Sequence, residues 1–346
     1  MTSRAHLERP HRSRLGFEGR AELCVVESDA LRGNPLGDPH LRELPVYLPP
    51  SHDEHPAPVI LVLSGFTGRG HKYLEPHPWN TSVAERFDRM VARGEARPAI
   101  LVMPDCFTKL GGSQFVDSSA TGAYETHVVH ELLPLVEEHF NTQPGAVGVC
   151  GKSSGGFGAL RLAMRHPGLF RAAASLSGDC DFELCFGHEM LAAARGLARS
   201  GRTPAEFLAA FAEKPDLSGD GHAILNVLAM AACYSPNPDS ELGFDLPMDL
   251  EYAERDEAVW ERWRAFDPLE ACAQHADALR ALDLLYLECG LADEFNLQWG
   301  LRRLARRLRE LEVPHEHVEH AGGHRGIDDR YDLVLPKLAA VLDTRA

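Results

Sequence analysis

Three residues of this sequence, Ser153, Asp293 and His324, have the types and the chain order of a nucleophilic catalytic set. A serine hydroxyl is a poor nucleophile at neutral pH, so it needs an imidazole to take its proton and a carboxylate to hold that imidazole in the right tautomer. Ser153 lies in the pattern Gly151-x-Ser153-x-Gly155, whose small flanking residues allow a strained turn that exposes the hydroxyl. The three residues together predict a centre for acyl transfer.

Two other interpretations of the glycine-rich turn compete with the nucleophile. A phosphate-binding loop of the form G-x-x-x-x-G-K-[ST] needs a glycine at position 146, but Ala146 stands there and Gly145 is one place early, so that pattern fails. The other is a chance match in a glycine-rich turn. The apolar run 147–150 before the turn and the helical pattern 157–164 after it favour the nucleophile, because this motif joins a strand to a helix.

The acid and the base each have a close competitor. In hydrolases with this chain order, serine, acid and histidine each follow a strand. Asp293 follows the strand expected at 282–288, and His324 follows the one expected at 315–319. Glu294 is the alternative acid and His320 the alternative base, because the order fixes the loops and not the individual residues.

The transition state of acyl transfer also needs two backbone N–H donors for its oxyanion. One is expected from Ser154, directly after the nucleophile, and the other from the glycine-rich loop that follows the apolar run 59–63. Phe66 is our candidate for the second donor. Thr67 is the alternative donor and a candidate substrate contact.

The elements that must position these residues alternate between strand and helix. Strands are expected at 21–26, 41–48, 59–63, 99–103, 147–150, 172–176, 282–288 and 315–319, and helices at 82–93, 124–140, 157–164, 297–311 and 332–342. This alternation predicts an α/β fold, a mostly parallel twisted sheet flanked by helices. In such sheets the ligand crevice lies at the carboxyl ends of the strands, where all the candidate loops fall.

Residues 180–266 interrupt the alternation with helical patterns and are too long for a simple crossover. We therefore predict a mobile N-terminal arm at 1–19, a core domain at 20–179 and 267–346, and an inserted helical cap at 180–266. The cap leaves the sheet at the carboxyl end of a strand. Its apolar residues Phe182, Phe186 and Met230 are candidates for a substrate pocket, although packing in the core is the commoner role for any one apolar residue.

Charge and composition restrict the partners. The chain of 346 residues carries 35 Lys and Arg against 51 Asp and Glu, a net charge of -16, which argues against nucleic acid or an anionic membrane as the main partner. A small-molecule ester is the expected partner. The sequence leaves the oligomeric state open, a homo-oligomer included.

The eight cysteines form no C-x-x-C pair, and most lie in apolar segments where a thiol packs as a small hydrophobic group. Cys180, Cys185 and His188 are close in sequence, but their spacing matches no common zinc pattern. We expect no metal, no organic cofactor and a reducing compartment. Because residues 1–20 are polar and Arg-rich and no run reaches membrane-spanning length, the expected location is the cytoplasm.

Several motifs in this chain occur together in one known family. They are Leu63-Ser64-Gly65-Phe66-Thr67, Met103-Pro104-Asp105, Gly151-Lys152-Ser153-Ser154-Gly155-Gly156-Phe157-Gly158-Ala159, Gly290-Leu291-Ala292-Asp293 and Gly322-Gly323-His324. The set resembles the esterase D family of α/β-hydrolases, which includes formylglutathione hydrolases, feruloyl and siderophore esterases and mycolyl transferases.

This resemblance implies an α/β-hydrolase fold and a triad of Ser153, Asp293 and His324, with Phe66 and Ser154 as the oxyanion donors. Ser64 departs from the His or Asp that members often carry at that place, and the insertion is longer than in the simplest members, so the resemblance does not imply a particular ester.

The function expected from the sequence is hydrolysis of carboxylic esters through an acyl-enzyme on Ser153. An acyltransferase would use the same triad but pass the acyl group to an alcohol or thiol, and a peptidase would share the tetrahedral intermediate. The alternative from another class is a non-catalytic binding module of the same fold.

Overall fold

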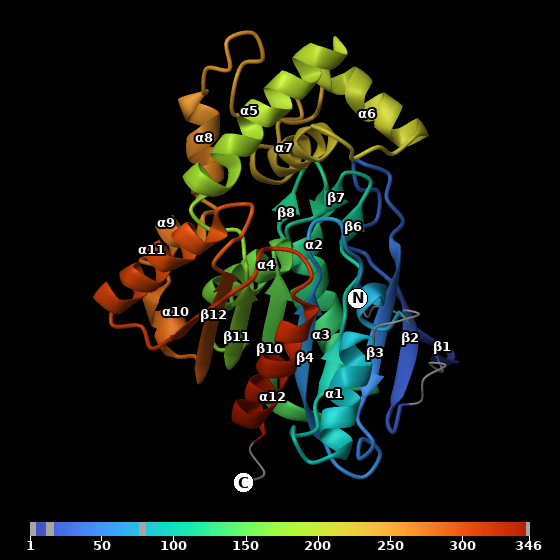
Figure 1. Cartoon of the computed structure of the whole chain (residues 1–346). Coiled ribbons are helices and arrows are strands. Elements are labelled where there is room, and N and C mark those ends of the chain that lie inside the picture. Colours follow the sequence, from blue (N-terminus) through green and yellow to red (C-terminus); the bar gives the residue numbers. More distant parts are fainter. Residues whose placement is uncertain (1–4, 12–16, 76–80, 344–346) are drawn as a thin grey trace.

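The computed structural model describes residues 5–11, 17–75 and 81–343, and nine of the described strands form one sheet (Figure 1). Their order across the sheet is β1-β2-β3-β5-β4-β10-β11-β12-β13. The six strands from β5 to β13 in this order run parallel, whereas β1, β2 and β3 pair antiparallel. The expected α/β class with a mostly parallel sheet is therefore confirmed.

The strands of the sheet are β1 (Ala5–His11), β2 (Arg20–Glu27), β3 (Leu41–Leu48), β4 (Ala57–Leu63), β5 (Ile100–Val102), β10 (Thr142–Lys152), β11 (Ala172–Leu176), β12 (Leu284–Gly290) and β13 (Glu316–His320). Two small hairpins lie between β5 and the next core helix, outside the main sheet. They are β6 (Phe107–Thr108) with β7 (Gly111–Gly112), and β8 (Asp117–Ser118) with β9 (Gly122–Ala123).

The core helices are α1 (Val83–Ala92), α2 (Tyr124–Thr126), α3 (Leu133–His139), α4 (Ser154–Arg165), α9 (Pro268–Ala271), α10 (Ala276–Arg280), α11 (Leu297–Glu310) and α12 (Tyr331–Leu342). A π-helical turn at His127–Leu132 joins α2 to α3, and 3₁₀ turns lie at Gly70–Tyr73 and Asp328–Arg330. Among the described residues, no helix is both long and apolar enough to cross a bilayer.

Strand β4 shows why helices cover both faces of the sheet. All of its residues are buried, as expected for a central parallel strand. Because successive side chains of a strand point to opposite faces, Val59, Leu61 and Leu63 join the apolar core under α3, α4 and α11, whereas Ile60 and Val62 join the core under α1 and α12. Strand β10, which ends at Lys152 directly before Ser153, lies beside β4, between these two cores.

The N-terminal segment differs from the expected mobile arm. Residues 5–11 form β1, which pairs antiparallel with β2. An edge strand such as β2 offers unpaired N–H and C=O groups to any passing backbone, so this pairing does not need the apolar alternation by which strands are predicted. Residues 1–4 and 12–16 of the expected arm lie outside the described residues.

Four helices occupy the insertion: α5 (Phe182–Ser200), α6 (Pro204–Glu213), α7 (Gly221–Tyr234) and α8 (Glu257–Arg264). Figure 1 shows them gathered at the end of the sheet where β10 and β11 finish. The buried Asp267 joins the two ends of this insertion. Its carboxylate accepts the backbone N–H groups of Asp181 at 3.0 Å and Phe182 at 2.7 Å, where the insertion begins, and of Leu269 at 2.9 Å, where it ends.

We expect Asp267→Ala to loosen the insertion, because it leaves two buried N–H donors and one partly buried N–H donor without an acceptor. One unsatisfied buried polar group costs about 1–3 kcal/mol, so the predicted loss of unfolding free energy is about 3 kcal/mol or more. Urea unfolding followed by circular dichroism measures it. Asp239→Ala removes an exposed carboxylate from the same insertion and should change stability by less than about 0.5 kcal/mol. Equal stability of the two variants would contradict this role.

Candidate active site

The turn between β10 and α4 holds Ser153 in a strained conformation. Ser153 has φ 58° and ψ −127°, which an L-residue rarely adopts, and its N–H donates to the Leu176 carbonyl at 2.9 Å. Glycines are sterically necessary beside it. A Cβ on Gly155 would lie 2.1 Å from the Leu63 oxygen, and one on Gly151 would lie 2.4 Å from the Gly155 carbonyl carbon. The pattern recognised in the sequence is thus a packing requirement of this turn.

Ser153, His324 and Asp293 form one hydrogen-bonded chain. Nε2 of His324 lies 3.0 Å from Oγ of Ser153, and Nδ1 lies 2.9 Å from Oδ2 of Asp293. The three residues follow β10, β12 and β13, so the carboxyl ends of three parallel strands bring them together. Asp293 is 4% exposed and His324 6%. An imidazole held in this way can accept the hydroxyl proton of the serine.

The surroundings of Asp293 keep it ionised. Burial alone would raise the pKa of this carboxyl, but the hydrogen bond and charge of His324 outweigh it, and the pKa stays below its ordinary value. The Phe295 N–H also donates to Oδ1 at 2.9 Å. A carboxylate fixed at two oxygens orients the imidazole and stabilises its protonated form.

The alternative acid and base, Glu294 and His320, lie near the triad but do not form the hydrogen bonds made by Asp293 and His324. Oε2 of Glu294 accepts the backbone N–H of His324 at 2.6 Å, so this carboxylate holds the loop and not the imidazole. His320 ends β13, and a Cβ on Gly322 would lie 2.8 Å from its Nδ1. Neither residue lines the cavity at Ser153. The geometry therefore favours Asp293 and His324 over Glu294 and His320.

Two backbone N–H groups beside the nucleophile are free to bind an oxyanion. Among the residues that the structure describes, no acceptor pairs with the N–H of Phe66 or of Ser154, although both residues are buried. The β6–β7 hairpin fixes the first of them, because Gly112 donates its N–H to the Phe66 carbonyl at 2.7 Å. The Ser154 hydroxyl accepts from Gln114 Nε2 at 2.6 Å and donates to Asp179 Oδ2 at 3.3 Å.

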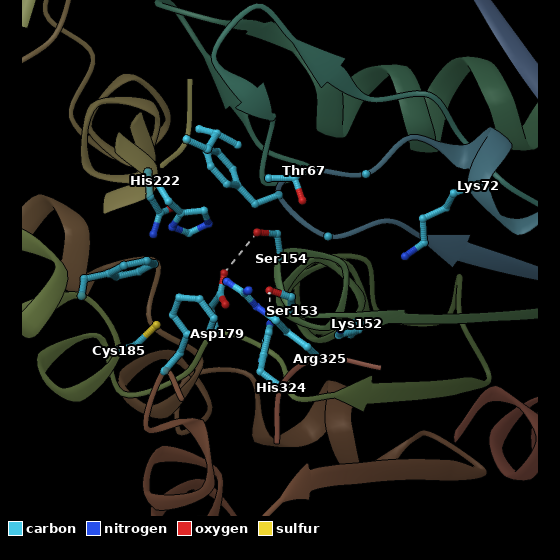
Figure 2. A pocket seen from close by; sticks show the side chains of 17 residues that line it. Thr67, Lys72, Lys152, Ser153, Ser154, Asp179, Cys185, His222, His324 and Arg325 are labelled. Atoms are coloured by element: carbon cyan, nitrogen blue, oxygen red, sulfur yellow. Dashed lines mark hydrogen bonds between the residues drawn. The ribbon is translucent and has the colours of Figure 1, made fainter. Parts of the chain in front are cut away.

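A cavity of about 560 Å³ opens at Ser153 (Figure 2). Its walls come from the loop after β4, the β10–α4 turn, the cap and the loops that carry Asp293 and His324. They are Gly65, Phe66, Thr67, Gly68, Lys72, Lys152, Ser153, Ser154, Asp179, Cys185, Phe186, Leu217, His222, Asn226, Phe295, His324 and Arg325. A cavity of this size suits a small organic molecule.

Of the expected pocket residues, Thr67 and Phe186 line the cavity but Phe182 and Met230 do not. Both of these are fully buried in the core between the cap and the sheet. The Phe182 ring lies 5.3 Å from that of Tyr234 and 6.0 Å from that of Phe157, so it joins α5 and α7 to α4. The expectation of a pocket wall is wrong for Phe182 and Met230, because both are fully buried members of the apolar core and neither lines the cavity.

The sequence of this chain matches one known protein family. A model of the Esterase family matches residues 39–326. This chain belongs to the Esterase family. The matched residues include the Ser153, Asp293 and His324 positions.

Several known proteins resemble this chain in sequence or in fold. S-formylglutathione hydrolase of Bos taurus is 26% identical over 148 residues, 40% of this chain and 52% of that protein, so the chain matches about half of its relative's length. An S-formylglutathione hydrolase from Agrobacterium tumefaciens superposes with a TM-score of 0.62 at 17% identity, covering 97% of this chain and 99% of the other. A ferulic acid esterase gives 0.60 at 20%, covering 95% and 100%. The expected α/β-hydrolase fold and esterase D relationship are confirmed.

This Esterase family member has cavity residues that the sequence analysis missed. The ring of His222, from α7, lies edge-on to Phe66 at 5.9 Å and tilted to Phe295 at 5.8 Å, and the Phe295 ring lies 4.7 Å from that of His324. Burial lowers the pKa of His222. Phe295 could have been found by its place two residues after Asp293, but no pattern in the sequence of α7 distinguishes His222 from the chain's other histidines.

Asp179 was also missed, and it is the carboxylate in the cavity wall. It is 7% exposed, and burial raises its pKa to about 6, against the opposing influence of the His324 charge and the Ser154 hydroxyl. Between its ordinary pKa of about 4 and this value, the folded protein binds a proton that the unfolded chain has released, so stability falls as the pH rises through this window. The cost of ionising Asp179 is fully present at neutral pH.

Asp179→Asn should therefore stabilise the protein at pH 7.5 by up to ~3 kcal/mol, because the amide keeps an oxygen for the Ser154 hydroxyl but carries no charge. Urea unfolding of wild type and variant at pH 7.5 and pH 4 measures the difference. The gain should shrink at the lower pH, where Asp179 is protonated in the folded state. An unchanged stability at pH 7.5, or the same gain at both pH values, would show that burial does not penalise this carboxylate.

Proposed function

We propose that this chain is a serine hydrolase that cleaves carboxylic esters through an acyl-enzyme on Ser153. The observation that carries the proposal is the hydrogen-bonded chain from Ser153 through His324 to Asp293 at the wall of a cavity. Membership of the Esterase family supports the reaction type. In the described part of the chain, the backbone N–H groups of Phe66 and Ser154 have no acceptor, so both can bind the oxyanion of the tetrahedral intermediate.

The reaction begins when Oγ of Ser153 attacks the ester carbonyl carbon while Nε2 of His324 takes the hydroxyl proton. The N–H groups of Phe66 and Ser154 bind the oxyanion, and Asp293 stabilises the imidazolium. His324 then gives its proton to the departing alcohol oxygen as the C–O bond breaks, which leaves the acyl group on Ser153. His324 then takes a proton from a water molecule as that water attacks the acyl carbon, and returns the proton to Oγ of Ser153 as the acyl C–O bond breaks, which releases the acid and the free serine.

The insertion 180–266 acts in this proposal as a cap domain over the core of 20–179 and 267–346. It contributes Cys185, Phe186, His222 and Asn226 to the cavity wall, so it shapes the space in which the substrate is held. The cap also helps to position the oxyanion donor, because Tyr234 of α7 donates to Gln114 Oε1 at 3.3 Å and Gln114 donates to Ser154. The substrate is a small-molecule ester.

All eight cysteines are free and buried. This use of cysteine is typical of reducing compartments, so we propose the cytoplasm as the site of action.

The test of the proposed function is detection of the acyl-enzyme. The purified protein is mixed with 4-nitrophenyl acetate, quenched in acid and analysed by mass spectrometry, and the acetyl group should map to the peptide that contains Ser153. Turnover with and without an added alcohol separates hydrolysis from acyl transfer, because a transferase forms a new ester at the expense of acetate. Absence of both turnover and a Ser153 adduct would favour the non-catalytic binding module.

A further inference from the structure

Three cations lie along the wall of the cavity, next to the residues that react. Lys152 directly precedes Ser153, Arg325 directly follows His324, and Lys72 comes from the 3₁₀ turn after β4. Figure 2 shows Lys72 extending toward the cavity from the side of the Thr67 loop. Two of the five lysines in the chain therefore line this one cavity, in a protein whose net charge is -16.

These three cations form few ion pairs with carboxylates of the protein. Among the described residues, Lys152 and Arg325 have no hydrogen-bonded or ion-paired carboxylate, and Lys72 has only Asp328, at 3.9 Å and at the limit of an ion pair. The carboxylate in the wall, Asp179, is engaged by the Ser154 hydroxyl. In a chain with an excess of 16 negative charges, unneutralised cations at one place indicate a site that receives its anion from outside.

The position of Lys152 makes its charge costly. Its side chain is half-buried, and burial lowers the pKa of the ammonium. The charges of Lys72 and Arg325 lower the pKa further, while Asp328 and Asp293 act in the opposite direction. Like charges gathered in a partly dry cavity repel one another, and a bound anion would relieve that repulsion.

We propose that the ester cleaved here carries an anionic group, a carboxylate or phosphate, which Lys72, Lys152 and Arg325 bind beside the scissile bond. This inference rests on the proposed esterase activity and names its substrate class. Because two of the three cations are neighbours in sequence of Ser153 and His324, the anion is held close to the reacting carbonyl. It can belong to the acid part or to the alcohol part of the ester, and the two arms of the experiment distinguish these.

The experiment compares kcat/KM for two matched pairs of esters. In the first pair the acid part carries the charge: mono-4-nitrophenyl adipate against 4-nitrophenyl hexanoate. In the second pair the alcohol part carries it: 4-carboxyphenyl acetate against its methyl ester. Hydrogen bonds to charged groups contribute enough for a preference of about ten-fold or more for the anionic member of one pair. This preference should decrease as salt is raised from 0.05 to 0.5 M, because salt screens the cations (about 10 Å Debye length at 0.1 M).

Variants show whether the cations cause the preference. In Lys72→Met with Lys152→Met, the ratio of the two kcat/KM values should fall by about ten-fold, whereas Lys214→Met, which removes an exposed charge that does not line the cavity, should leave it unchanged. If the double variant does not fold, Lys72→Met and Arg325→Gln singly carry the test.

A wild type without preference in either pair, or a preference retained in the variants, would overturn the anion site. In both cases the neutral esters would still be hydrolysed. Loss of the neutral reactions and of the Ser153 adduct in the wild type would overturn the esterase proposal instead, so the two failures are distinguishable.

Discussion

Ser153→Ala should lower kcat for 4-nitrophenyl acetate by roughly 10⁵-fold or more, because it removes the hydroxyl that lies within hydrogen-bond reach of the His324 imidazole. The residual rate would come from the oxyanion donors and from binding. Stability should stay close to that of the wild type, since alanine at φ 58° carries the same backbone strain as serine. Kinetics together with a urea unfolding curve measure the two effects separately.

Ser153→Gly is the matched control for that strain. Glycine adopts positive φ without a steric penalty, so this variant should be as inactive as Ser153→Ala but more stable, by about 1 kcal/mol. This difference in stability between the two variants would show that the backbone of the turn is strained at position 153 and that the strain accompanies the exposed position of the serine hydroxyl. A folded Ser153→Ala protein with wild-type turnover would exclude Ser153 as the nucleophile.

The sequence predicts the Ser153 turn well because its requirements are local. Neighbouring backbone atoms leave no room for a Cβ at Gly151 or Gly155, so only glycine fits at either position. A requirement of this kind is visible in the sequence as a motif. The loops that carry the acid and the histidine could be predicted for a similar reason, since each follows a strand of an α/β sheet. The sequence could not decide between Asp293 and Glu294 as the acid, because what separates two adjacent residues on one loop is the direction in which their side chains point.

The cap residues show where the sequence stops being informative. An apolar helical face predicts that Phe182 and Met230 are buried, and both are. It does not say whether they are buried against other side chains or against an open cavity, which depends on how α5 and α7 pack on the core. Asp179 and His222 belong to the cavity through the same packing, and neither lies in a recognisable motif. The pairing of β1 with β2 is made by backbone hydrogen bonds, so the pattern of side chains in residues 5–11 does not predict it.

His324→Ala should be nearly as damaging as loss of the nucleophile, by roughly 10⁵-fold in kcat, because triad members act as a unit and an unassisted serine hydroxyl keeps its proton at neutral pH. His320→Ala is the matched control, since it removes an imidazole four residues earlier, at the end of β13, that does not line the cavity. Its turnover should stay within a few-fold of wild type.

A kinetic signature separates loss of the base from loss of the fold. His324→Ala should still bind substrate and unfold cooperatively in urea, and its slow reaction should speed up with rising hydroxide, which replaces the missing general base. His320→Ala should keep the wild-type pH profile. If instead His320→Ala were inactive and His324→Ala active, the 3.0 Å contact between His324 Nε2 and Ser153 Oγ would not be the catalytic one, and the base would have to reach the serine through a movement of the loop 321–326.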